Sequence, residues 1–75
     1  MTIYEAMTAP YEDIGMQEAE GRIPAETVCI YPPDIPVLIP GEIIRKEDME
    51  EIRRAMESGR RVTGIHGGRI RVVKQ

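Results

Sequence analysis

KEDMEEIRRAMESG, from Lys46 to Gly59, is the stretch that most clearly defines a structural element of this 75-residue chain. Apolar residues recur in it at helical spacing, and Glu and Arg occupy the other positions. The apolar positions are Met49, Ile52, Ala55 and Met56. Acidic residues come first and arginines later, which is the order that the helix dipole favours, and the glycine is expected to end the helix. The spacing predicts an amphipathic helix over residues 46–58, although Arg45 stands where a Ser, Thr or Asp cap is usual.

RRVTGIHGGRIRVVK, residues 60–74, follows this helix and has the pattern of a β-hairpin. Gly67 and Gly68 lie between two runs rich in β-branched residues, which is typical of a two-residue turn. Ile70 and Val72 alternate with arginines, so the last strand is expected to have one face exposed to water. We expect the apolar stripe of the helix to pack against this hairpin.

YPPDIPVLIPGE, Tyr31 to Glu42, precedes the helix and combines four prolines with four aliphatic residues. Solvated linkers are rich in Gly, Ser and charge because they bury nothing, so this segment is expected to be buried or to lie at an interface. Pro36 and Pro40 cannot donate to a strand ladder, which confines the extended run Val37–Ile39 to a sheet edge or to irregular pairing. Immediately upstream, ETVCIY (Glu26–Tyr31) is rich in β-branched residues and predicts a strand that ends at the first proline.

Two short helices are expected before this strand. Thr2–Met7 fits a short helical segment that ends before Pro10. The sequence MQEAEGR fits another, with Met16 and Ala19 facing inward and Gly21 at the left-handed C-terminal position. We therefore predict one small α+β domain over residues 1–75: short N-terminal helices, a strand, a proline-rich extended segment, one longer helix and a C-terminal β-hairpin.

Composition narrows the classes of protein. A chain of this length buries only about 60% of the surface that its unfolded form exposes, so we expect marginal stability and support from an oligomer or a neighbouring domain. The net charge of −3 argues against nucleic-acid binding. No run approaches the roughly 18 apolar residues of a membrane span, and the first residues lack a signal-peptide pattern. With one cysteine and one histidine, we expect a cytoplasmic protein without a structural zinc site.

The blocks EAEGRIPAETV (residues 18–28) and YPPDIPVLIPGE, followed by an acidic helix that ends at a glycine, carry a family resemblance. They resemble the C-terminal domain of the bacterial pyridoxal-phosphate-dependent ornithine/lysine/arginine decarboxylases, and the likeness covers nearly all of the chain. Asp34 stands where that family usually has Gly, and Glu20 replaces a usually apolar residue. The first block also looks like the opening of molybdopterin-biosynthesis enzymes, but their following Asp-Asn-Ser-Ala-Met-Asp-Gly-Tyr motif is absent.

The resemblance implies a domain that accompanies a separate catalytic domain. In the family, pyridoxal phosphate forms a Schiff base with a lysine that follows a histidine in the catalytic domain. Lys46 follows Arg45 and Lys74 follows Val73, so we expect no cofactor and no catalytic residue in this chain, and no activity from it alone. Its expected role is to complete the fold, the dimer packing and the active-site rim of a basic-amino-acid decarboxylase of polyamine metabolism. The expected partners are a catalytic pyridoxal-phosphate-binding domain or subunit and a second copy; the alternative is a free-standing protein-interaction module.

The proline segment is the expected interface or cleft rim. Polyproline-like backbone loses little entropy on binding, so Tyr31 and the two prolines after it suit a docking surface. Glu42 either faces a cleft that takes a basic side chain or interacts with the N-terminal end of the following helix. Val37 and Ile39 are expected to pack inward while the residue between them points away. The expected rim residues are Tyr31, Pro32, Pro33, Asp34, Ile35, Pro36, Leu38 and Glu42.

Two reactive side chains receive structural interpretations. His66 lies beside the predicted hairpin turn and is expected to be a solvated loop residue, although histidine is the usual proton shuttle. Cys29 lies in a β-rich run with nothing nearby in sequence to activate it, so it is expected to be a small core residue.

Overall fold

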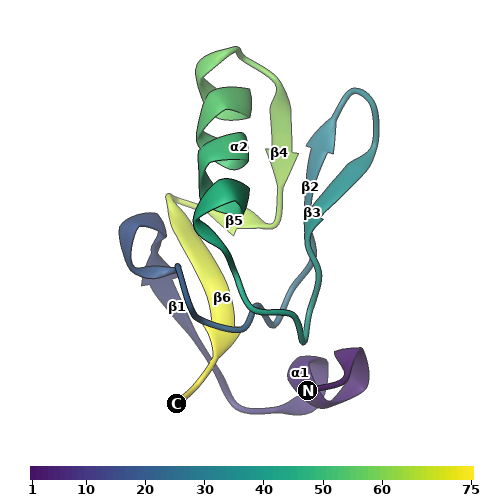
Figure 1. Ribbon diagram of the computed structural model, residues 1–75, viewed down its shortest axis with the longest axis vertical. Helices are drawn as coiled ribbons and strands as arrows, with labels where there is room; N and C mark the ends of the chain where they lie inside the picture. The colour runs from purple at the N-terminus through teal and green to yellow at the C-terminus, as the bar shows by residue number, and fades with distance from the viewer.

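The computed structural model describes residues 1–75 and contains two antiparallel three-stranded sheets and two helices (Figure 1). One sheet has the strand order β1-β6-β5, and the other has the order β3-β2-β4. The strands are β1 (Tyr11–Gly15), β2 (Val28–Tyr31), β3 (Ile35–Leu38), β4 (Arg61–Thr63), β5 (Ile65–His66) and β6 (Arg69–Val73). The helices are α1 (Ile3–Thr8) and α2 (Lys46–Glu57), with a 3-10 turn, η1 (Met16–Glu18), between β1 and β2. The α+β class predicted from the sequence is confirmed, and neither helix has the length and apolar character needed to cross a bilayer.

The helix α2 forms where its periodicity predicts. An acidic side chain caps its N-terminus, where no Ser, Thr or Asp cap residue is present. The backbone N–H of Arg45 donates to Oδ2 of Asp48 at 3.0 Å, and the Arg45 guanidinium lies 3.5 Å from Oδ1 of the same carboxylate. The carboxylate of Asp48, in the first turn, thus accepts a hydrogen bond from the backbone N–H of the cap residue, as the third residue of a capping box does. At the other end, the helix stops at Glu57, shortly before Gly59 as predicted, and Gly59 has a left-handed φ of 82°.

One member of the predicted apolar stripe of α2 is not in the core. Ile52 and Ala55 are 0% and 3% exposed, and Met49 is half-buried. Met56 is 45% exposed, so its assignment to the core was wrong. Met56 is on the same side of the helix as Ile52 but lies in the last turn, next to the end of the helix at Glu57.

The stretch predicted as one C-terminal hairpin is divided between the two sheets at Gly64. Upstream of it, β4 pairs with β2, and downstream β5 pairs with β6 through the predicted two-residue Gly67–Gly68 turn. Gly64 has φ +92°, and a Cβ there would lie 2.3 Å from the carbonyl oxygen of Thr27. Only glycine permits the chain to pass this close to the start of β2. The helix α2 lies mainly against β4 and β3, so it contacts the first strand of the predicted hairpin, as expected, and β3 in addition.

The strand β1 was not expected from the sequence. YEDIG carries two carboxylates and little apolar alternation, yet it pairs along β6 from Tyr11↔Val73 to Gly15↔Arg69. Cross-strand contacts accompany this pairing: Nε of Arg71 donates to Oδ1 of Asp13 at 3.1 Å, and its guanidinium lies 4.1 Å from the centre of the Tyr11 ring. The pairing partner, rather than intrinsic propensity, makes this segment a strand.

The core joins both sheets to α2. It consists of Ala19, Val28, Leu38, Ile44, Ile52, Ile70 and Val72, each no more than 2% exposed. Ala19 and Gly21 behave as predicted, because the first is fully buried beside η1 and the second has φ 85°. Fully burying an aliphatic side chain of this kind contributes about 1.5 to 3 kcal/mol.

Candidate functional site

The proline segment forms the exposed tip of the β2–β3 hairpin. Cys29 pairs with Pro36 and Ile30 with Ile35, and the tip lies at the same end of the molecule as the C-terminal end of α2 (Figure 1). β3 is an outer strand of its sheet, as the prolines predict. The tip residues Pro32, Pro33 and Asp34 are all exposed.

An arginine missed by the sequence interpretation braces this tip. Nη2 of Arg60 donates to the carbonyl oxygen of Pro32 at 2.8 Å, across 28 positions of the chain. Tyr31 is half-buried at the base of the tip, and the negative charge of Asp34 raises the pKa of its phenol. The tip therefore presents one carboxylate, with a phenol and a guanidinium at its base. No local signal marks Arg60, because its contact depends on β4 pairing beside β2.

The expected rim residues do not form one cluster. Glu42 follows the Pro40–Gly41 turn, which lies at the opposite end of the hairpin beside α1 (Figure 1). Its side chain is exposed and makes no hydrogen bond or ion pair, and the start of α2 is capped by Asp48 instead. The structure thus separates Glu42 from the tip residues and does not place it at the helix N-terminus.

The apolar residues of the segment do not alternate as expected, although Val37 does pack against the core. Leu38 is 2% exposed and belongs to the core, so the expectation that it points away was wrong. Val37 and Ile39 are half-buried, and Ile35 at the tip is 38% exposed. The register between β2 and β3 shifts between Val28 and Cys29, and this irregular pairing places Val28 opposite Leu38. The segment is apolar largely because its second half completes the domain's own core.

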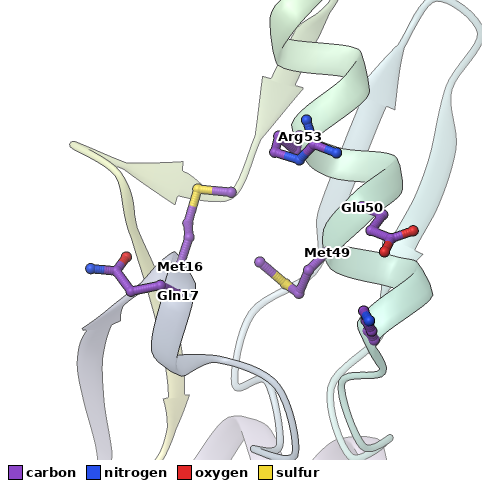
Figure 2. A pocket seen from close by; sticks show the side chains of 6 residues that line it. Met16, Gln17, Met49, Glu50 and Arg53 are labelled. Carbon is purple, nitrogen blue, oxygen red and sulfur yellow. The ribbon is translucent and has the colours of Figure 1, made fainter.

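An open hollow of about 320 Å³ lies between η1 and α2. Figure 2 shows that the side chains of Met16 and Met49 project into it from η1 and α2. Its lining consists of Met16, Gln17, Lys46, Met49, Glu50 and Arg53. The hollow thus has an apolar floor and a rim of mixed charge.

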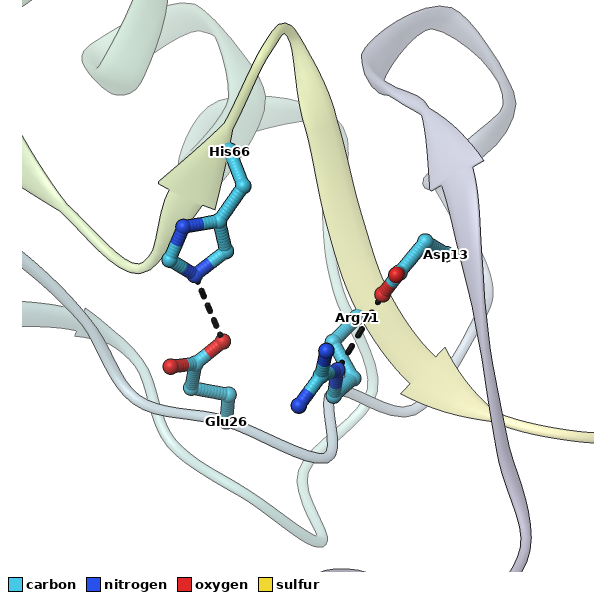
Figure 3. A network of polar contacts seen from close by, with 4 residues as sticks. All are labelled: Asp13, Glu26, His66 and Arg71. Atoms are coloured by element: carbon cyan, nitrogen blue, oxygen red, sulfur yellow. Dashed lines mark hydrogen bonds and ion pairs between the residues drawn. The ribbon is translucent and has the colours of Figure 1, made fainter.

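A small group of polar contacts lies beside the strands β5 and β6 (Figure 3). Nε2 of His66 lies 3.2 Å from Oε1 of Glu26, and the neighbouring pair joins Arg71 to Asp13. The His66 side chain is 63% exposed, so it is solvated as expected, but it belongs to the strand β5 and not to a loop. Cys29 is only half-buried at the middle of β2, so its description as a core residue was wrong.

The described residues do not fit a pyridoxal-phosphate site. Such a site needs a lysine for the Schiff base and a charged partner for the pyridine nitrogen, in a shielded pocket. Lys46 stands at the exposed edge of the open hollow, and Lys74 is exposed near the C-terminus. No group of three His, Cys, Asp or Glu side chains is arranged to hold a metal ion.

Residues 21–26 (GRIPAE), part of the first block of the family resemblance, hold the segment before β2 in place. Nη2 of Arg22 donates to Glu12 at 2.6 Å and to the carbonyl oxygen of Val73 at 3.0 Å. The backbone beyond it runs along β6, where the N–H of Ala25 donates to the carbonyl of Arg71 at 3.0 Å. This arginine therefore ties the segment before β2 to both β1 and β6.

The structure is thus a small α+β domain with two three-stranded sheets, one amphipathic helix and a proline-rich hairpin. The family model described as "Orn/Lys/Arg decarboxylase, C-terminal domain" matches residues 2–66, and the chain belongs to this family. The match decides for the decarboxylases over the molybdopterin-biosynthesis likeness of the first block.

The individual relatives are much longer proteins. The chain is 44% identical to an arginine decarboxylase of Bacillus subtilis over 78 residues, which covers 100% of the chain and 16% of that protein. It is 43% identical to an arginine decarboxylase of Bacillus anthracis over 60 residues, or 80% of the chain and 12% of that protein. The structure of the E. coli constitutive lysine decarboxylase matches 99% of the chain and 13% of its own length, with a TM-score of 0.76 and 28% identity. The chain thus corresponds to a small terminal part of these relatives.

Proposed function

We propose that this chain is the accessory C-terminal domain of a basic-amino-acid decarboxylase and that it is not catalytic alone. The proposal is supported by the family match over residues 2–66. The chain aligns with only 16% of the length of a relative named as an arginine decarboxylase. The remaining part of the enzyme binds the pyridoxal phosphate, since both lysines of this chain are exposed and neither lies in a shielded pocket.

The β2–β3 tip is the part of this domain that we assign to the rim of the active-site entrance. Its exposed carboxylate, Asp34, suits the cationic side chain of ornithine, lysine or arginine. Arg60 holds the tip backbone at Pro32, which lowers the entropy that the tip loses on contact with a partner. Exposed Ile35 adds an apolar contact for the catalytic domain or for a second protomer.

A domain exchange tests the proposal. This chain replaces the corresponding C-terminal region of the B. subtilis arginine decarboxylase, and carbon dioxide release from arginine is compared with the intact enzyme and with a truncated form. We expect the chimera to retain activity that the truncated form lacks. A chimera no more active than the truncated form would contradict an accessory role.

The isolated chain provides the complementary measurement. Mixed with pyridoxal phosphate, it should show no Schiff-base absorption band and release no carbon dioxide from any basic amino acid. A band that appears and is then lost in Lys46→Ala or Lys74→Ala would show that the chain itself holds the cofactor.

A further inference from the structure

The first helix exposes the largest share of apolar side chain in the molecule. In α1, Ile3, Tyr4 and Met7 are 53%, 77% and 62% exposed, and only Ala6 is buried. Its one charged residue, Glu5, is engaged in capping the helix itself. Contiguous exposed apolar surface of this kind usually marks an interaction site.

The helix is held in place despite its six residues. The backbone N–H of Thr2 donates to Oε1 of Glu5 at 2.8 Å, and the N–H of Glu5 donates to Oγ1 of Thr2 at 3.0 Å. At its other end the hydroxyl of Thr8 donates to the carbonyl of Tyr4 at 2.8 Å. Isolated helices this short are unstable in water, so these contacts keep the apolar face presented in a fixed form.

The body of the domain also anchors α1 at the Pro40–Gly41 turn. Gly41 has φ +96°, and a Cβ there would lie 2.6 Å from the carbonyl oxygen of Met1. Two residues further on, Ile43 is 62% exposed. The Pro40–Gly41 turn therefore supports the start of α1, and an exposed apolar side chain follows this turn in the sequence.

The occupant of this surface follows from the layout of the relatives. The matching part is their C-terminal domain and makes up only 12% to 16% of their length, so nearly all of a relative's chain precedes the counterpart of α1. A contact close to such a junction closes a short loop and therefore loses little chain entropy. Because α1 carries a single charged residue, its exposed face is suited to contact an apolar surface of a partner and not a charged ligand.

We propose that the α1 face, defined by Ile3, Tyr4 and Met7, docks on the catalytic part of the decarboxylase. This inference rests on the proposed function and adds the surface that makes the contact. The α1 face and the β2–β3 tip lie at opposite ends of the molecule (Figure 1). Docking through α1 therefore leaves the tip free to reach another part of the assembly.

Hydrogen exchange of the α1 amides measures docking independently of activity. In the chimera with the B. subtilis arginine decarboxylase, exchange should be at least about tenfold slower than in the isolated chain, because docking opposes local opening. The variant Ile3→Ser/Tyr4→Ser/Met7→Ser should abolish this added protection. In the isolated chain it should lower the melting temperature by less than about 12 °C, because three exposed positions cost at most about 0.5 kcal/mol each.

A matched pair separates docking from a general loss of apolar surface. Met7→Ser and Met56→Ser remove the same side chain from exposed positions of α1 and α2. In the chimera, Met7→Ser should speed thermal inactivation several-fold, and Met56→Ser should change it less than twofold. Equal effects of the two substitutions would overturn the inference.

The outcomes distinguish the two proposals. An active chimera whose α1 amides gain no protection overturns the docking surface and leaves the accessory role in place. An inactive chimera with protected α1 amides supports docking and contradicts the accessory role. If the isolated chain instead forms a dimer that the triple variant abolishes, without added protection in the chimera, the occupant is a second copy and the inference is wrong.

Discussion

Ile52→Ala should remove a large fraction of the stability of this domain. Ile52 is 0% exposed at the centre of the core that joins α2 to both sheets. The substitution deletes three buried carbons, worth about 2.4 kcal/mol at roughly 0.8 kcal/mol each. A residual cavity adds to this loss, and buried Ile→Ala changes cost about 2 to 5 kcal/mol in total.

A domain of 75 residues has a free energy of unfolding of about 4 to 11 kcal/mol, so the loss approaches the whole in the weaker case. At about 4 to 8 °C per kcal/mol, a loss of about 3.5 kcal/mol lowers the melting temperature by roughly 14 to 28 °C. Thermal unfolding followed by circular dichroism measures the shift, with Met56→Ala as the control at an exposed position of the same helix. A drop of only a degree or two for Ile52→Ala would refute the assignment of this residue to the core.

Three further predictions concern the turn, the helix cap and association. Gly64→Ala should lower the melting temperature clearly more than Gly67→Ala, because both glycines have positive φ but only Gly64 would push a Cβ into the Thr27 carbonyl; equal shifts would contradict the close approach. The hydrogen bonds from Thr2 lower the pKa of Glu5 below its ordinary 4.5, so its contribution to α1 is present above that pH and is lost as the pH falls through the lowered value. Amide chemical shifts of α1 recorded from pH 6 downward, with Glu5→Gln as the control, should show this loss, whereas the same shifts in both proteins would exclude it. The chain should also self-associate at high concentration through the apolar surface at the β2–β3 tip, and sedimentation should show Ile35→Ser shifting the mass toward the monomer; a monomer at every concentration would contradict this.

The elements that the sequence predicts are those whose signals are local. The periodicity of α2, the Gly67–Gly68 turn and the β-branched run of β2 each depend on residues close together in the chain, and each is where it was expected. The strand β1 was missed because two carboxylates hide its propensity and its partner, β6, is about 58 positions away. The division at Gly64 was missed for a similar reason, since the need for glycine arises from the carbonyl of Thr27.

The candidate site was predicted less well than the fold. The exposed tip residues were identified from the prolines, but the direction of Leu38 depends on an irregular register between β2 and β3 that no sequence pattern specifies. Glu42 was grouped with the tip by proximity in sequence, whereas the strand between them carries it to the other end of the hairpin. The exposure of the apolar α1 residues was missed because a short helix rich in apolar residues does not indicate which side the domain covers.

The position of β6 in the middle of the β1-β6-β5 sheet determines where this domain can be cut. The family match stops at residue 66, three residues before β6 begins. A recombinant fragment trimmed to that boundary would lose Ile70 and Val72, both fully buried, and would leave β1 and β5 without the strand that joins them. Expression designs and domain-boundary assignments for related decarboxylases should therefore extend through the equivalent of Val73.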